Sequence, residues 1–336
     1  MENGPGTSIK EAVNSFLDSV ALSRSPHTAR AYKNAMNFFL EILSQHNLSI
    51  ESKITELPED AISWFASALK VTAPATERLY LTAASRLYEF LAAETLTNPN
   101  LPRIHLLIRQ RSRRPGQRLP QFPQSMIEEV LKYAINLTYT QVEDQQERLR
   151  NLRDRAYLLT LADTGLRVHE AVGLRRGDMD WNEGKAIIIG KGDRQDIVRF
   201  STRSLSALQD YLRARASVDG ASGRSLSSQP LFARHDKGAG KKVKPITTAT
   251  GRNIVNQRVQ EAIGNEAVGK ITPHSFRHYF VTTVLRGSGN LKMAQELARH
   301  KNIAVTQRYA HLSDDELDRG YWEIFEDSST DDQLME

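Results

Sequence analysis

The sequence predicts a mainly α-helical protein with one small β-sheet, divided between two domains. Apolar residues recur at the three- and four-residue spacing of amphipathic helices along most of the chain. Only two short runs, 186–189 and 197–200, have the β-branched composition of strands. The length of 336 residues is typical of two domains, and a segment rich in proline and arginine, 98–123, separates the two halves.

Residues 1–97 contain four amphipathic patterns. Ser25-Pro26-His27-Thr28 precedes the second pattern and has the composition of a helix start. This part of the chain is therefore predicted to form a small all-α domain of four helices. The apolar sets are Ile9, Val13, Phe16, Leu17 and Val20; Tyr32, Met36, Phe39, Leu40 and Leu43; Ile62, Phe65, Ala66 and Leu69; and Leu79, Ala83, Leu87, Phe90 and Leu91.

The net charge of +5 conceals an uneven distribution. Residues 314–336 contain ten acidic residues and one basic residue, Arg319. Residues 1–313 therefore hold 44 Lys and Arg against 30 Asp and Glu, an excess of 14 positive charges. Such an excess favours a polyanionic partner such as nucleic acid, although it is also compatible with a merely solvated basic surface.

Segment 98–123 combines five prolines and six arginines with no acidic residue. Proline lacks an N–H donor and favours extended chain, so the segment is predicted to be an extended linker. Its charge density favours a path along a phosphate backbone over a connector that only keeps the protein soluble. The candidate DNA-binding residues are Arg109, Arg111, Arg113 and Arg114.

The second half, 124–313, shows mixed patterns. Helices are predicted at 148–163, ending at Thr164-Gly165, at 167–174 and at 203–216, and helices dominate again from about 250 to 325. The two strands join through Gly190-Lys191-Gly192-Asp193, which has the glycines of a hairpin turn. Residues 219–250 are predicted to be mostly loop, anchored only at Pro230-Leu231-Phe232.

The stretch ITPHSFRHYF, 271–280, places two histidines and an arginine in about one helical turn. It could bind a metal, fill a core or bind a phosphate. His274 and His278 share a helix face, but Arg277 would repel a divalent cation and no glutamate lies between them. With Thr272 as N-cap and Pro273 as the first helical residue, His274 lies where free N–H groups favour an anion. This stretch alone leaves phosphate binding and core packing both open.

Four further residues are individually weak candidates. Arg167 follows a predicted turn and either pairs only with Glu170, three residues on, or is held by it toward a ligand. Lys191 lies at a hairpin tip, where lysine is usually solvated, and its glycines lack the spacing of a phosphate-binding loop of nucleotide triphosphatases. His300 ends one predicted helix, and Tyr309 lies nine residues later on the next.

Together these residues resemble the signature of the tyrosine recombinase (phage integrase) family. That signature has an arginine in TGLRxxE, a lysine in a β-hairpin, an H-x-x-R helix, and a histidine nine residues before a nucleophilic tyrosine. This chain has, in the same order, TGLRVHE, GKGD, PHSFRH, LARH and TQRYAHL. The motifs span about 120–313, and SPHTARAYKNAMNFF resembles the family's core-binding domain. Where the family usually has glycine before the second histidine, this chain has Arg299, which would either alter the backbone approach or add a DNA contact.

The resemblance implies a Xer-like architecture with a core-binding DNA-binding domain at 1–97, a linker at 98–123 and an α+β catalytic domain at 124–313. In the acidic segment 314–336, roughly helical spacing of apolar residues leads to the separate hypothesis that a C-terminal helix docks on a neighbouring protomer; these residues are Leu317, Tyr321, Ile324 and Phe325. The resemblance also implies site-specific cutting and rejoining of duplex DNA without metal, ATP or other cofactor. The partners implied are DNA at a specific site, further copies in a synaptic tetramer, and an unknown activating protein. The implied catalytic residues are Arg167, Lys191, His274, Arg277, His300 and the nucleophile Tyr309.

Two alternatives remain open on the sequence: DNA relaxation like that of type IB topoisomerases, and a DNA-bridging or regulatory protein that does not cut. The first residues, MENGPGTSIK, lack the features of a secretory signal, and no apolar run has the roughly 18–20 residues that span a bilayer. The expected location is the cytoplasm, with no membrane partner.

Overall fold

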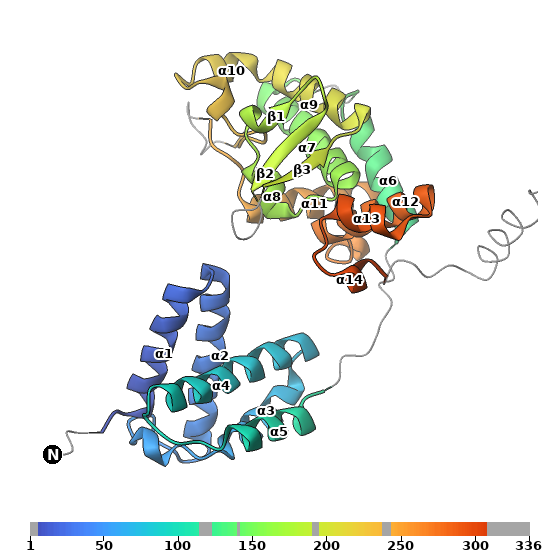
Figure 1. Cartoon of the computed structure of the whole chain (residues 1–336). Coiled ribbons are helices and arrows are strands. Elements are labelled where there is room, and N and C mark those ends of the chain that lie inside the picture. Colours follow the sequence, from blue (N-terminus) through green and yellow to red (C-terminus); the bar gives the residue numbers. More distant parts are fainter. Residues whose placement is uncertain (1–5, 114–122, 140–141, 190–194, 237–242, 308–336) are drawn as a thin grey trace, which may run out of the picture. The chain divides into compact units, whose positions relative to one another are not determined.

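The computed structural model describes residues 6–113, 123–139, 142–189, 195–236 and 243–307. The chain divides into two compact units, residues 1–118 and 119–336, which Figure 1 shows in blue to teal and in green to red. Each unit has its own hydrophobic core. Within the described ranges, no helix is long and apolar enough to cross a membrane.

The first unit is a bundle of helices, and the four predicted helices are all present. Ser8 and Ser25 accept hydrogen bonds from the first-turn N–H groups of two of them, as expected for N-caps. The apolar faces meet in a core that includes Phe39 and Phe65, whose rings pack edge to face with centroids 5.1 Å apart. The helices are α1 (Ile9–Ser23), α2 (Pro26–Gln45), α3 (Ala61–Ala68), α4 (Pro74–Ala93) and α5 (Leu101–Arg111).

Helix α5 corrects the prediction of extended chain through 98–123. Pro102 lies in the first turn, where its missing N–H has no helical partner to lose, and Asn100 accepts a hydrogen bond from the Arg103 N–H as N-cap. Ile104 is fully buried in the core of the first unit. The prolines therefore mark the beginning of a helix and the chain beyond it, and α3 and α4 both contact this helix.

The second unit surrounds a central helix, α7, which contacts α6, α8, α9 and α12. The predicted helix stop at Thr164-Gly165 is confirmed, because α7 ends there with Gly165 in the left-handed conformation. The helices are α6 (Gln124–Asn136), α7 (Gln145–Thr164), α8 (Val168–Gly173), α9 (Thr202–Ala214), α10 (Ala216–Gly220), α11 (Thr248–Ile263), α12 (Pro273–Ser288), α13 (Leu291–Ala298) and α14 (Ile303–Gln307).

A small antiparallel sheet in the order β1-β2-β3 completes the second unit (Figure 1). The two predicted strands are β2 (Lys185–Ile189) and β3 (Gln195–Arg199), and they pair with Ala186 opposite Val198. The third strand, β1 (Met179–Asp180), has only two residues, too few for a periodic pattern to show. The predicted turn 190–193 lies outside the described residues.

The segment predicted to be mostly loop, 219–250, is more firmly anchored than expected. Leu231 and Phe232 are fully buried, which confirms the predicted anchor. Asp219 is also buried, where Arg215 and Arg176 pair with it at 2.9 and 2.6 Å. His235 is buried as well, with its Nε2 2.7 Å from the Tyr211 hydroxyl. A composition of Gly, Ser and Lys concealed these polar anchors because each depends on a partner from another element.

Candidate active site

The turn after α7 organises the site. Gly165 has φ +59°, and a Cβ there would lie 2.4 Å from Cδ1 of Phe280 on α12. Glycine is therefore required at this position for two reasons, the left-handed backbone and the close approach of α12. The turn directs the Gly165 carbonyl toward Arg277 on α12, whose Nη1 donates to it at 2.5 Å.

Arg167 follows this turn as the N-cap of α8. Its backbone N–H donates to Glu170 at 2.8 Å, and its Nη1 contacts the other oxygen of the same carboxylate, also at 2.8 Å. Glu170 is buried, whereas the Arg167 side chain is 44% exposed. Burial raises the pKa of Glu170, but the Arg167 N–H and the neighbouring guanidiniums lower it more, so the carboxylate stays charged. The predicted pairing of Arg167 with Glu170 is thus confirmed. That the pair holds Arg167 toward a ligand stays a prediction.

Arg277 is buried and fixed by backbone carbonyls. Its two terminal nitrogens donate to the carbonyls of Gly165 and Ala298, which come from the ends of α7 and α13. The N-terminus of α12 matches the prediction, with Thr272 as N-cap, Pro273 in the first turn and a capping-box bond from the Thr272 N–H to Ser275 Oγ at 3.1 Å. Arg277 therefore reaches the site from α12 and is held by carbonyls at the ends of α7 and α13.

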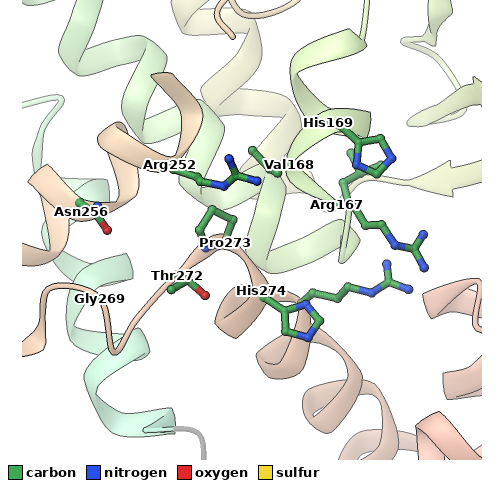
Figure 2. Close-up of a pocket in the computed structure, with 11 residues that line it drawn as sticks. Arg167, Val168, His169, Arg252, Asn256, Gly269, Thr272, Pro273 and His274 are labelled. Atoms are coloured by element: carbon green, nitrogen blue, oxygen red, sulfur yellow. The ribbon is translucent and has the colours of Figure 1, made fainter. Parts of the chain in front are cut away.

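Arg167, His274 and Arg277 line one pocket of about 410 Å³. In Figure 2 Arg167 and Asn256 lie on opposite sides of the view, with Arg252 and His274 between them; Arg252 and Asn256 come from α11. Guanidinium and imidazole groups that line one cavity have the chemistry to bind a phosphate or another oxyanion. Of the interpretations of 271–280, phosphate binding fits this arrangement; core packing fits Phe276, which is fully buried.

The histidines of the site are held neutral at neutral pH. Desolvation lowers the pKa of His274, and the positive charges of Arg277 and Arg167 lower it further. The ring of His278 meets that of His274 edge to face with centroids 4.2 Å apart. Burial, His274 and Arg277 lower the pKa of His278 to about 4. Among the described residues, no three His, Cys, Asp or Glu side chains are placed to hold a metal ion.

His300 follows α13 and is fixed on both sides. Its Nδ1 lies 2.9 Å from the hydroxyl of the fully buried Thr306, and Gln295 bonds its carbonyl at 3.0 Å. Burial lowers its pKa to about 4, and Arg277, Arg167 and Arg299 each contribute. The structure therefore brings His300 within electrostatic range of the arginines that line the pocket. Lys191 and Tyr309 lie outside the described residues.

The linker arginines differ among themselves. Arg109 and Arg111 are exposed on the last turn of α5. Arg113 instead turns into the first unit, where its Nε pairs with the buried Glu77 and its Nη2 donates to the Thr72 carbonyl at 2.5 Å. This guanidinium has a structural partner, which the run of like charges in the sequence did not suggest. Arg114 lies outside the described residues.

Sequence reasoning did not place two further residues at this site. Arg252 lines the pocket from α11, and no periodic pattern marked it. For Arg299 the sequence suggested a changed backbone approach or a DNA contact, and not a buried pair with Glu170. Its side chain is 7% exposed and its Nη2 lies 3.2 Å from Glu170, so it is part of the same cluster.

Comparisons with known proteins identify the family of this chain. The model of the phage integrase family matches residues 135–316. Tyrosine recombinase XerC of Staphylococcus aureus is 26% identical over 311 residues, 91% of this chain and 93% of that protein. Tyrosine recombinase XerC of Pelobacter propionicus is 36% identical over 174 residues, 51% of this chain and 52% of that protein. The family model covers more than half of the chain, and the chain belongs to the phage integrase family.

Solved structures show the same fold. The site-specific recombinase XerH bound to its difH substrate aligns with a TM-score of 0.65 at 18% identity, covering 94% of this chain and 84% of XerH. The Tn1549 transposon integrase in complex with a circular intermediate DNA aligns with a TM-score of 0.64 at 17% identity, covering 95% of this chain and all of the integrase chain. The mainly α fold with a small sheet is therefore confirmed.

Proposed function

We propose that the chain is a site-specific tyrosine recombinase that cuts and rejoins duplex DNA through a covalent link to Tyr309. The observation that supports this best is the convergence of Arg167, His274 and Arg277 on one pocket from segments far apart in the sequence. The relatives named XerC are tyrosine recombinases, and the two solved structures hold a site-specific recombinase, XerH, and the Tn1549 transposon integrase on DNA.

In the proposed reaction the Tyr309 hydroxyl attacks the phosphorus of a phosphodiester. The bond from phosphorus to the 5′ oxygen breaks, leaving a 3′-phosphotyrosyl protein and a free 5′-hydroxyl. Attack by a 5′-hydroxyl on the same phosphorus reverses the step and releases the tyrosine. One phosphoester replaces another at each step, so the scheme requires neither ATP nor metal.

Arg167 and Arg277 stabilise the charge that develops on the nonbridging phosphate oxygens. Arg277 is suited to this role because the carbonyls of Gly165 and Ala298 fix its guanidinium before DNA binds. Preorganised donors of this kind do not have to reorient during the reaction, and each typically contributes about a hundred- to a thousand-fold in rate.

The histidines and Lys191 move or hold protons in this scheme. A neutral His274 can accept the proton of Tyr309, and its lowered pKa keeps it neutral at pH 7. With its Nδ1 engaged by Thr306, His300 can donate from Nε2 to a phosphate oxygen. Lys191 is the proposed general acid that protonates the leaving 5′ oxygen.

A covalent-adduct assay tests the proposal. Binding sites are selected from random duplex DNA, and the wild-type protein is incubated with the selected site carrying a nick that prevents rejoining. A DNA–protein adduct that survives denaturation is expected, and Tyr309→Phe is expected to form none. Absence of the wild-type adduct would favour a DNA-bridging protein that does not cut, and an adduct in Tyr309→Phe would exclude Tyr309 as nucleophile.

Plasmid substrates separate recombination from relaxation. A plasmid with two selected sites is expected to yield exchanged products, whereas a supercoiled plasmid with none is expected to stay supercoiled. Relaxation of the plasmid without sites would instead assign the type IB topoisomerase activity.

The assembly proposed for exchange is a tetramer on two DNA sites. Residues 314–336 would dock on a neighbouring protomer, and the partner that activates exchange is unidentified. A cytoplasmic location is part of the proposal because the substrate is DNA. Truncation at Ser313 tests the docking segment, since tetramers that still form on DNA would contradict it.

A further inference from the structure

Position 299 has an unusual backbone for an arginine. Arg299 follows α13 in the left-handed region, with φ +56° and ψ +43°, and its N–H closes the helix on the carbonyls of Gln295 and Glu296. Helices commonly end in this conformation with glycine, because a Cβ makes it unfavourable. An arginine at this position therefore needs a compensating interaction.

The side chain of Arg299 provides that interaction inside the protein. It is 7% exposed, and its Nη2 lies 3.2 Å from Glu170 Oε2 and 3.5 Å from the Gly165 carbonyl. Its Nη1 donates to the Leu297 carbonyl at 3.4 Å, while its buried Nε has no hydrogen-bond partner. An arginine that contacts DNA would extend into solvent. The Arg299 side chain instead points into the protein, toward Glu170 and the Gly165 carbonyl.

Arg299 and Arg167 contact the same carboxylate. Nη1 of Arg167 contacts Oε1 of Glu170, and Nη2 of Arg299 contacts Oε2. Two positive charges thus share one negative charge, and Asp196 on β3 acts on Arg299 only through a weaker electrostatic interaction. Because Arg299 neutralises part of the negative charge of Glu170, Glu170 can orient Arg167 and still neutralise less of the positive charge of Arg167.

We propose that Arg299 is a positioning residue of the phosphate-binding site, which acts through Glu170 to orient Arg167 and to keep its positive charge directed at the phosphate. This inference rests on the proposed recombinase function. It assigns Arg299 no contact with DNA.

The test compares variants of the full-length protein on the nicked selected site. Arg299→Gly is expected to slow single-turnover cleavage about ten-fold while leaving DNA affinity and its salt dependence unchanged. Its thermal unfolding midpoint should change little, because the relaxed left-handed backbone of glycine offsets the lost pair with Glu170. Arg299→Lys should recover most of the rate by restoring the charge, and Arg299→Met, which keeps an apolar stem without charge, should be as slow as the glycine variant.

A double variant shows whether the effect passes through Glu170. Glu170→Gln alone is expected to slow cleavage, and Glu170→Gln with Arg299→Gly should be no slower than Glu170→Gln alone. Losses that multiply would overturn the proposal. A slope of log affinity against log salt that falls by about 0.9 in Arg299→Gly would also overturn it, because that change indicates a direct phosphate contact.

The outcome also separates this inference from the proposed function. If wild-type protein forms the Tyr309 adduct and Arg299→Gly cleaves at the wild-type rate, only the role of Arg299 is wrong. If wild-type protein forms no adduct, the recombinase function itself is wrong.

Discussion

Two arginine–glutamate pairs, one in each unit, show how the surroundings of an ion pair decide its role. Glu77 in the first unit and Glu170 in the second are both buried, and each is shared by two cations. Arg113 turns its Nε and Nη2 into the first unit, toward Glu77 and two carbonyls. Arg167 contacts Glu170 through its backbone N–H and, from its guanidinium, through Nη1, and its side chain lines a pocket. In the first unit the pair with glutamate thus holds the chain at Arg113 against the core. In the second unit the pair leaves the Arg167 guanidinium lining the pocket.

The largest effect is expected at Arg167. Arg167→Ala should lower the single-turnover cleavage rate about a hundred- to a thousand-fold, because it removes a donor fixed toward the developing charge. The matched change, Arg113→Ala, should leave cleavage on saturating DNA within about three-fold, since nothing in its contacts reaches the pocket. Quenched-flow or gel assays of the nicked site measure both rates. Equal losses would show that the two pairs do not differ in role.

Gly165 connects the two arginines of the pocket, and changing it should strongly destabilise the second unit. Gly165→Ala places a Cβ in the left-handed region and 2.4 Å from the Phe280 ring. The expected loss is about 3 kcal/mol in the free energy of unfolding, from backbone strain and overpacking together. Gly287→Ala is the control, because it lies in α12 with nothing within 4 Å, and it should stabilise by about 0.5–1 kcal/mol. Urea unfolding followed by circular dichroism measures both, and a neutral Gly165→Ala would contradict the close packing of α12.

The sequence predicted the parts of this molecule whose signal is local. Helix periods, the Ser25 and Thr272 caps and the glycine that ends α7 are set by neighbouring residues, and the structure has them. Helix α5 was missed because prolines and arginines outweighed a short apolar pattern around Ile104, whose burial depends on α3 and α4. The inward turns of Arg113 and Arg299 could not be predicted, because each depends on a glutamate far away in the sequence. The roles assigned to the six signature residues remain predictions.

The first-unit pair should contribute to stability rather than to rate. Arg113→Met leaves the buried Glu77 with Lys70 alone, and since Arg113 is 35% exposed the loss should be about 1–2 kcal/mol in the free energy of unfolding. Trp64 in α3, with Trp181 and Trp322 changed to Phe, reports unfolding of the first unit by fluorescence. Adding Glu77→Gln to Arg113→Met should recover part of the loss, and a further loss would argue against the pair.

The buried His235 in the second unit should make the stability of that unit depend on pH. Burial lowers the pKa of His235 to about 3, and the charges of Arg153 and Arg215 contribute. The folded pKa of His235 lies below the unfolded value of about 6.5, so the unfolded chain binds a proton at this residue more readily. The contribution of His235 to the free energy of unfolding is therefore fully present above pH 6.5 and is lost as the pH falls toward 3. Between pH 7 and pH 5 this costs about 2 kcal/mol in the free energy of unfolding. Urea titrations at pH 7 and pH 5 measure the drop in the free energy of unfolding, which should be smaller by that amount in His235→Gln than in the wild-type protein. An unchanged drop would mean that His235 is protonated in the folded state.

The smallest effect separates the arginines at the end of α5. Arg109 is exposed on the last turn, whereas Arg113 is bound to Glu77. If the predicted phosphate contact of Arg109 exists, Arg109→Gln should lower the slope of log affinity against log salt by about 0.9, a few-fold change in affinity at moderate salt. Arg113→Gln should change the slope by much less, because its charge is already paired inside the protein. Fluorescence anisotropy on the selected site at several salt concentrations measures both slopes, and a larger change at Arg113 than at Arg109 would mean that DNA binding breaks the pair with Glu77.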